Sequence, residues 1–194
     1  LTVDLTNPDV YAKETIILRR GDLHIFRGKF IWQATCYEWL RIANYGLLPV
    51  EIDFSFQFDC DFADIFEVRG VKREKRGTRL ETEIARQTVA LAYRGLDNVT
   101  RRTEINFDPA PGLLTGTEAF FKTVLTSKKD EIYCLSYSFQ TESVKPARHS
   151  RTAALAEAKG ALDSLRANEC KISTSNEEFD GWLERSLSDL HMMF

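Results

Sequence analysis

The chain has 194 residues, of which 43% are hydrophobic and 28% are charged. This length suits one well-packed domain with or without an appendage. The fractions of hydrophobic and charged residues are those of a folded globular protein and not of a disordered one. The formal net charge of −3 disfavours nucleic acid as the main partner. No apolar run of about 18 residues predicts a membrane span, and "LTVDLTNPDV" at the start lacks the features of a secretory signal. We therefore expect a cytoplasmic protein without a membrane partner.

Strand patterns dominate the first two-thirds of the chain. Residues 14–46 alternate between polar and apolar positions and are interrupted by three glycines. Within this stretch the alternation predicts one strand face formed by Phe30, Trp32, Ala34 and Cys36, with Ile31, Gln33 and Thr35 on the other. The segment "VEIDFSFQFD" alternates more cleanly still, with Ile52, Phe54, Phe56 and Phe58 on one side. One buried and one solvated face is typical of an antiparallel sheet.

Further strands are predicted at Thr88–Tyr93, Thr100–Phe107, Glu118–Leu125 and Glu131–Gln140. Because these strands follow one another without intervening helices, they predict a sandwich and not a βαβ fold. The predicted fold class is therefore mainly β, an antiparallel, supersandwich-like β-sandwich followed by two C-terminal α-helices.

The hydrophobic pattern changes from strand-like to helical near residue 146. Leu155, Ala158, Leu162 and Leu165 form one helical stripe. Ser175 and Glu178 have the spacing of a capping box, ahead of a second apolar face formed by Phe179, Trp182, Leu183, Leu187 and Leu190. We predict a sandwich domain over residues 1–145 and a helical linker over 146–194. The abrupt start and the apolar ending "HMMF" predict a piece of a longer polypeptide. Alternatively, a homodimer could bury the apolar face of the last helix.

Candidate catalytic groups are few. Asp59 and Asp61, two apart on one predicted strand, would project carboxylates about 6.5–7 Å apart on the same face, which is within the range of inverting glycosidases. Solvated acids on the polar face of a strand are the commoner explanation. The three histidines, His24, His149 and His191, show no metal-binding spacing, and neither do the four cysteines, Cys36, Cys60, Cys134 and Cys170. We therefore predict no catalytic residue, metal or cofactor.

A dense basic run covers residues 69–79. It contains no aromatic residue between Val71 and Arg79, so it lacks the stacking groups expected of a nucleic-acid site. Because so many like charges repel one another unless they are solvated or paired, a mobile hairpin tip is the simpler interpretation. Contact with an acidic neighbouring domain is the alternative.

Directly before this run stands "DFADIFEVRG". Together with "VDLTNPD", "LRIANYGLLPVEIDFSFQFD" and "SNEEFDGWLERSLSDLHMM", it resembles the N-terminal domain of bacterial glycogen debranching enzymes of the amylo-α-1,6-glucosidase type. The resemblance covers nearly the whole chain. It implies a β-sandwich beside a catalytic barrel of paired helices, with α-glucan and the chain's own C-terminal catalytic domain as partners. The barrel and an earlier segment containing Gly…Asp-Thr-Arg are absent here, so no catalytic acid carries over.

The resemblance also implies a place for the motif itself. It implies that five residues of the motif lie at the junction with the barrel or near the glucan cleft: Asp61, Asp64, Phe66, Glu67 and Arg69. We interpret the motif as a strand end and turn, with Arg69 suited to a forked ion pair with a barrel carboxylate. Three functions stay open: a non-catalytic scaffold for the barrel, a stand-alone carbohydrate-binding sandwich, and an interaction module using residues 69–79.

Overall fold

The computed structural model describes residues 1–147, 149–167 and 172–191. Two compact units divide the chain, Leu1–Ala154 and Leu155–Phe194. The first unit contains the strands and the second contains most of the helical residues. The predicted mainly-β fold with two C-terminal helices is confirmed.

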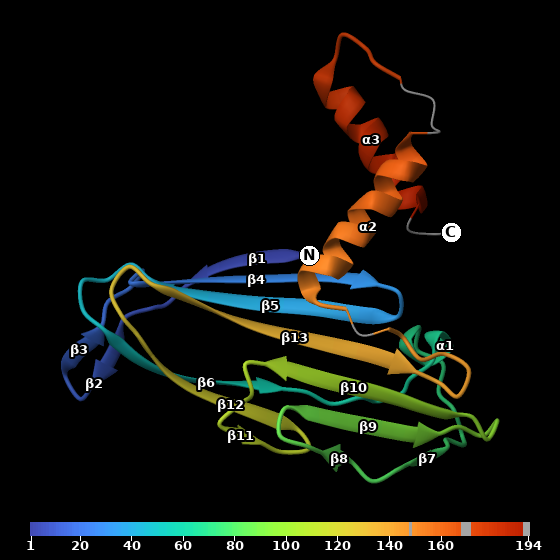
Figure 1. Ribbon diagram of the computed structural model, residues 1–194, viewed down its shortest axis with the longest axis horizontal. Coiled ribbons are helices and arrows are strands. Elements are labelled where there is room, and N and C mark those ends of the chain that lie inside the picture. The colour runs from blue at the N-terminus through green and yellow to red at the C-terminus, as the bar shows by residue number, and fades with distance from the viewer. Residues whose placement is uncertain (148, 168–171, 192–194) are drawn as a thin grey trace. The chain divides into compact units, whose positions relative to one another are not determined.

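The largest sheet of the first unit has eight strands, all antiparallel (Figure 1). In spatial order these are β1 (Thr2–Thr6), β4 (Leu23–Trp32), β5 (Thr35–Asn44), β13 (Asp130–Gln140), β10 (Thr100–Asp108), β9 (Thr88–Arg94) and β7 (Thr78–Arg79), and β8 (Glu83–Ile84) also pairs with β9. A smaller sheet joins β11 (Leu113–Leu114), β12 (Glu118–Leu125) and β6 (Val50–Gln57). β2 (Val10–Ala12) and β3 (Thr15–Leu18) form a separate hairpin.

Aromatic side chains fill the space between the eight-stranded and three-stranded sheets. Phe54 of β6 stacks on Phe121 of β12, with ring centroids 5.2 Å apart, and meets the edge of Tyr133 from β13 at 4.8 Å. Phe56 and Phe58 pack against the same core. The predicted inward face of β6 is therefore confirmed. Its intervening residues point away from the core and are exposed.

The predicted single strand across Phe30 to Cys36 is wrong, because β4 turns back into β5 at Gln33 and Ala34. These two residues have φ values of 45° and 54°, which is the left-handed pair that a two-residue hairpin of type I′ requires. The turn changes which side chains meet. Phe30 pairs with Tyr37 and stacks on it at 5.0 Å, whereas Ile31 pairs with Cys36.

The outer face of this hairpin carries Trp39, opposite Gly28 on β4. A Cβ atom at position 28 would lie 2.3 Å from the Trp39 ring, so only glycine fits there. The guanidinium of Arg151 lies 5.0 Å from the ring centroid of Trp39, within the range of a cation–π interaction. Arg151 is the first residue of α2 (Arg151–Arg166). This contact ties the beginning of α2 to the sheet.

A buried carboxylate lies on the inner face of the same sheet. The Glu38 side chain has no exposed surface, and it receives hydrogen bonds from Arg27 and from the Tyr137 hydroxyl, the latter at 2.9 Å. The Lys29 ammonium lies 3.0 Å from its second oxygen. Burial raises the pKa of Glu38, but the hydrogen bonds from these three partners lower it by more, so the pKa falls below its usual value. The group is therefore charged at neutral pH.

The second unit contains the rest of α2 and the helix α3 (Glu177–His191). The predicted capping box from Ser175 to Glu178 is wrong by one residue: the Asn176 side chain accepts hydrogen bonds from the backbone N–H groups of Glu178 and Phe179, at 3.0 and 3.2 Å. Asparagine is as good an N-cap as serine. On α3, Phe179, Trp182 and Leu190 are exposed. No helix among the described residues is long and apolar enough to cross a membrane.

The Glu38 contacts predict a specific pH dependence of stability. Because the folded pKa lies below the unfolded value, Glu38 contributes stability above an unfolded pKa of about 4.3, and this is lost as the pH falls through the folded pKa. We expect Glu38→Gln to lower the free energy of unfolding at pH 7 by about 1–3 kcal/mol, since Arg27 and Lys29 keep their charges and lose the opposite charge that they contact. Urea unfolding between pH 7 and pH 3 measures both effects.

Glu51→Gln is the matched control. Glu51 is 55% exposed and pairs with Lys122, so its removal should change stability by less than about 0.5 kcal/mol. If Glu38→Gln retained the wild-type loss of stability below pH 5, the assignment of that loss to Glu38 would be wrong.

Candidate functional site

The motif that carries the family resemblance follows directly after β6. This strand ends at Gln57, so Asp59 and Asp61 lie in irregular chain beyond it. The predicted pair of carboxylates on one strand face is therefore wrong. Asp59 instead makes a forked ion pair with Arg79, at 3.0 and 3.2 Å, while Asp61 accepts a hydrogen bond from the backbone N–H of Ala63 at 3.0 Å.

A single helical turn, α1 (Ile65–Val68), replaces the predicted strand end and turn. Asp64 caps it by accepting hydrogen bonds from the N–H groups of Phe66 and Glu67, both at 2.9 Å. The Glu67 carboxylate accepts in return from the N–H of Asp64, at 3.2 Å. This reciprocal arrangement is a capping box. The acid–x–x–Glu spacing from Asp64 to Glu67 was the sequence signal for it.

The basic run pairs with these acids and forms no hairpin of its own. Arg73 contacts Asp64, and Arg76 contacts Glu67 at 2.8 Å. With the Asp59–Arg79 pair, three arginines of the run are paired with acids between positions 59 and 67. Hydrogen bonds from Arg79 and from the Cys60 N–H lower the pKa of Asp59 below its usual value. Such a carboxylate stays ionised and cannot serve as a general acid.

Hydrophobic side chains on and after α1 remain uncovered. Their exposed fractions are 56% for Ile65, 59% for Phe66, 71% for Val68 and 55% for Val71; we call these four residues the α1 patch. Arg69 is exposed beside the patch, and its side chain forms no ion pair with any described residue. Of the residues predicted at a junction, Asp61, Asp64 and Glu67 shape the turn, whereas Phe66 and Arg69 are available at its surface.

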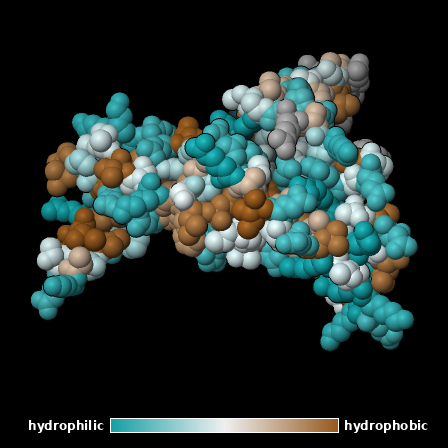
Figure 2. Space-filling model, turned by 60° about the horizontal axis from the view of Figure 1, so that its bottom comes forward, coloured by the Kyte–Doolittle hydropathy of each residue, from teal (hydrophilic) through white to brown (hydrophobic). Residues whose placement is uncertain are grey.

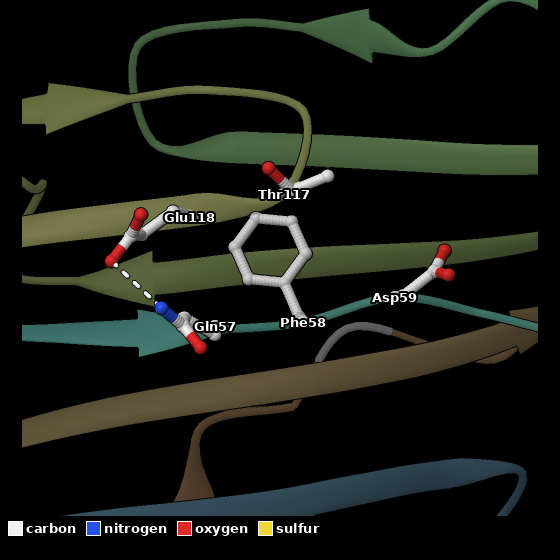
Figure 3. Close-up of a pocket in the computed structure, with 5 residues that line it drawn as sticks. All are labelled: Gln57, Phe58, Asp59, Thr117 and Glu118. Carbon is white, nitrogen blue, oxygen red and sulfur yellow. Dashed lines mark hydrogen bonds between the residues drawn. The ribbon is translucent and has the colours of Figure 1, made fainter.

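A second candidate site lies on the outer face of the three-stranded sheet and was not predicted. Ser55 and Gln57 of β6 both reach Glu118 of β12: the Ser55 hydroxyl donates to the Glu118 carboxylate at 2.6 Å and the Gln57 amide donates at 3.4 Å. In Figure 3 Gln57 and Glu118 extend toward each other across the strand pair. A hollow of about 420 Å³ is lined there by Gln57, Phe58, Asp59, Thr117 and Glu118.

A second hollow, of about 470 Å³, continues along the same pair of strands and is lined by Asp53, Phe54, Ser55, Gly112, Leu113, Phe120, Phe121 and Lys122. Together the two hollows form what we call the β6–β12 groove. Phe120 is 39% exposed and Leu113 is 59% exposed. The signal for this site was the pair Phe120–Phe121: on an alternating strand, only one of two adjacent phenylalanines can point into the core.

Figure 2 shows hydrophobic side chains gathered in patches among hydrophilic ones on the face in view. The described residues contain no group of three or more His, Cys, Asp or Glu side chains placed to hold a metal ion. His24 pairs with Asp4 at 3.0 Å, and Cys60 contacts the Thr103 hydroxyl at 3.6 Å. Cys170 and the side chain of His191 lie outside the described residues.

The family model described as the N-terminal domain of (some) glycogen debranching enzymes matches residues 1–136. A solved structure titled putative kojibiose phosphorylase from human microbiome aligns with a TM-score of 0.45 at 13% identity, covering 73% of this chain and 19% of that one. A polysaccharide lyase aligns with a TM-score of 0.39 at 13% identity, covering 64% and 21%. The chain thus spans about a fifth of each. No curated protein matches it.

Two substitutions of Asp64 separate the effect of the N-cap from the effect of its charge. Asp64→Ala removes both the cap and the Arg73 pair, and should cost about 1 kcal/mol of local stability. Asp64→Asn keeps a good cap and removes only the charge, so it should cost less than half as much. Hydrogen exchange of the Phe66 and Glu67 amides measures this directly. Equal protection in both variants would show that the cap does not hold the turn.

Proposed function

The chain belongs to the family of N-terminal domains found in some glycogen debranching enzymes, and from this premise we propose that it is the non-catalytic N-terminal domain of an α-glucan-debranching glycoside hydrolase. Its role is to support a separate catalytic domain of the amylo-α-1,6-glucosidase type. The α1 patch is the surface that makes this contact, and α-glucan is the substrate of the enzyme as a whole.

The observation that carries this proposal is the exposure of the α1 patch. Four large apolar side chains between positions 65 and 71 are each more than half exposed. Contiguous apolar patches on a protein surface mark sites of contact with another molecule. The turn that presents them is held by a capping box and by three acid–arginine pairs, so little conformational entropy is lost on binding. All of these residues lie within the matched range, 1–136.

The acids of the motif support a structural role. A retaining or inverting glycosidase needs one carboxyl group with a raised pKa to protonate the leaving oxygen. Asp59 has a lowered pKa, and Asp64 and Glu67 are engaged by arginines and by backbone N–H groups. The contacts of Asp59 favour its ionised form. Catalytic carboxylates are therefore expected on the partner domain.

The pairing within residues 59–79 bears on the nucleic-acid alternative. Phosphate binding needs lysine and arginine side chains that are free to neutralise phosphates, which releases the counterions condensed on the nucleic acid. Arg73, Arg76 and Arg79 already contact carboxylates of the same segment. Arg69 forms no ion pair among the described residues, and its planar guanidinium suits a forked ion pair with a carboxylate of the catalytic domain.

The test begins with the gene beyond the codon for Phe194, where the proposal requires a frame that encodes a helical catalytic domain. That domain, purified separately, should bind the 194-residue chain. Phe66→Asp with Val68→Asp should weaken the association by at least tenfold, because a charge is placed in an apolar contact. Isothermal calorimetry measures the affinity, and glucose release from a branched limit dextrin locates the activity.

Ile17→Asp is the matched control, since Ile17 is 61% exposed on β3 and is remote in sequence from the α1 patch. It should leave the affinity unchanged. A stop codon after Phe194 together with no binding partner among debranching hydrolases would overturn the proposal, as would branch hydrolysis by the 194-residue chain alone. Concentration-dependent dimerisation lost with Trp182→Asp would assign the exposed α3 face to a second copy.

A further inference from the structure

We propose that the β6–β12 groove binds a chain of α-linked glucosyl units, so that the domain holds the substrate as well as supporting the catalytic domain. The identity of the sugar rests on the proposed function. The location, the neutral charge of the ligand and the contacts rest on the groove itself.

The groove departs from what an ordinary solvated sheet face requires. Outward positions of a half-buried sheet are normally polar. Here Phe120 faces outward opposite Ser55 and pairs with Leu113 on its other side, and both apolar side chains are well exposed. An aromatic face is an apolar platform for the C–H surface of a sugar ring. The hollows, at about 420 and 470 Å³, have the size of ligand sites, which run from about 300 to 1,000 Å³.

Hydrogen-bonding groups stand beside this platform in a fixed arrangement. Glu118 accepts from both Ser55 and Gln57, which leaves lone pairs of the carboxylate and the amide oxygen for further partners. Planar carboxylate and amide groups suit adjacent hydroxyls, each of which donates and accepts. Because these side chains already hold one another in place, binding a sugar costs little additional ordering.

The charges of the groove favour a neutral ligand. Its acids are Asp53, Asp59 and Glu118, and its cation is Lys122, which pairs with Glu51 and lies 3.9 Å from Asp53. Asp59 is in turn neutralised by Arg79. An acidic surface repels nucleic acid and anionic lipid, whereas carboxylates accept hydrogen bonds from sugar hydroxyls.

The strand geometry suits an extended chain. Asp53, Ser55 and Gln57 point outward in succession on β6, and an antiparallel strand rises about 3.4 Å per residue. The row from Asp53 to Gln57 therefore covers about 14 Å, enough for several sugar rings end to end. Phe120 lies at the middle of this row, opposite Ser55.

The experiment uses the 194-residue chain and maltoheptaose, with binding followed by amide chemical shifts. We expect shifts along β6 and β12, and an affinity reduced about tenfold in Phe120→Ala, because the aromatic platform for the sugar ring is lost. Gln57→Ala should also weaken binding and is less disruptive to the fold. Val124→Ala is the matched control, because Val124 is 57% exposed on the same strand but lines neither hollow.

The salt dependence of the affinity distinguishes a site for a neutral sugar from a site for a charged ligand. For a neutral ligand, raising the ionic strength from 0.05 to 0.5 M should change the affinity by less than about twofold. The inference is overturned by absence of wild-type binding, by equal affinities in Phe120→Ala, Gln57→Ala and Val124→Ala, or by binding that collapses with salt. If the chain binds the catalytic domain through Phe66 but does not bind maltoheptaose, only the groove proposal is overturned. If it binds maltoheptaose in the groove but does not bind the catalytic domain, only the scaffold proposal is overturned.

Discussion

The aromatic contact between the two sheets is the constraint on which the rest of the unit depends. Phe54, Phe121 and Tyr133 fix how β6 and β12 lie on the eight-stranded sheet. Because side chains alternate along a strand, burying this row determines that Ser55, Gln57, Glu118 and Phe120 face outward. The outward side chains of the β6–β12 groove are therefore a consequence of this buried layer.

Much of the fold could be predicted from hydrophobic periodicity. The clean alternation of β6 identified its inner face, and the predicted bounds of Glu118–Leu125 coincide with β12. The hairpin at Gln33 and Ala34 escaped prediction because neither residue is a glycine or an asparagine, the usual signals for left-handed backbone. The short helix α1 also escaped, since a single turn has no periodicity to detect. Local hydrogen bonds decided its conformation instead.

The candidate sites depended on contacts that no local pattern contains. Opposite charges in neighbouring stretches suggested that pairing was available, but which arginine meets which acid follows from the turn at α1. Gln57 and Glu118 are 61 residues apart in the chain and meet through the register of β6 and β12. The resemblance of the motif to debranching enzymes agrees with the family match over residues 1–136.

The position of β13 has a consequence for biosynthesis. This strand lies between β5 and β10, and it supplies Tyr137 to Glu38 across 99 residues of chain. A ribosome therefore delivers β1, β4 and β5 long before the strand that completes their sheet. Until residue 140 emerges, β5 presents an unpaired edge and Glu38 lacks one of its hydrogen-bond donors. Such late, non-local closure slows folding and exposes the nascent chain to wrong pairing. Any shortened version that stops at 136, where the family match ends, would cut this central strand.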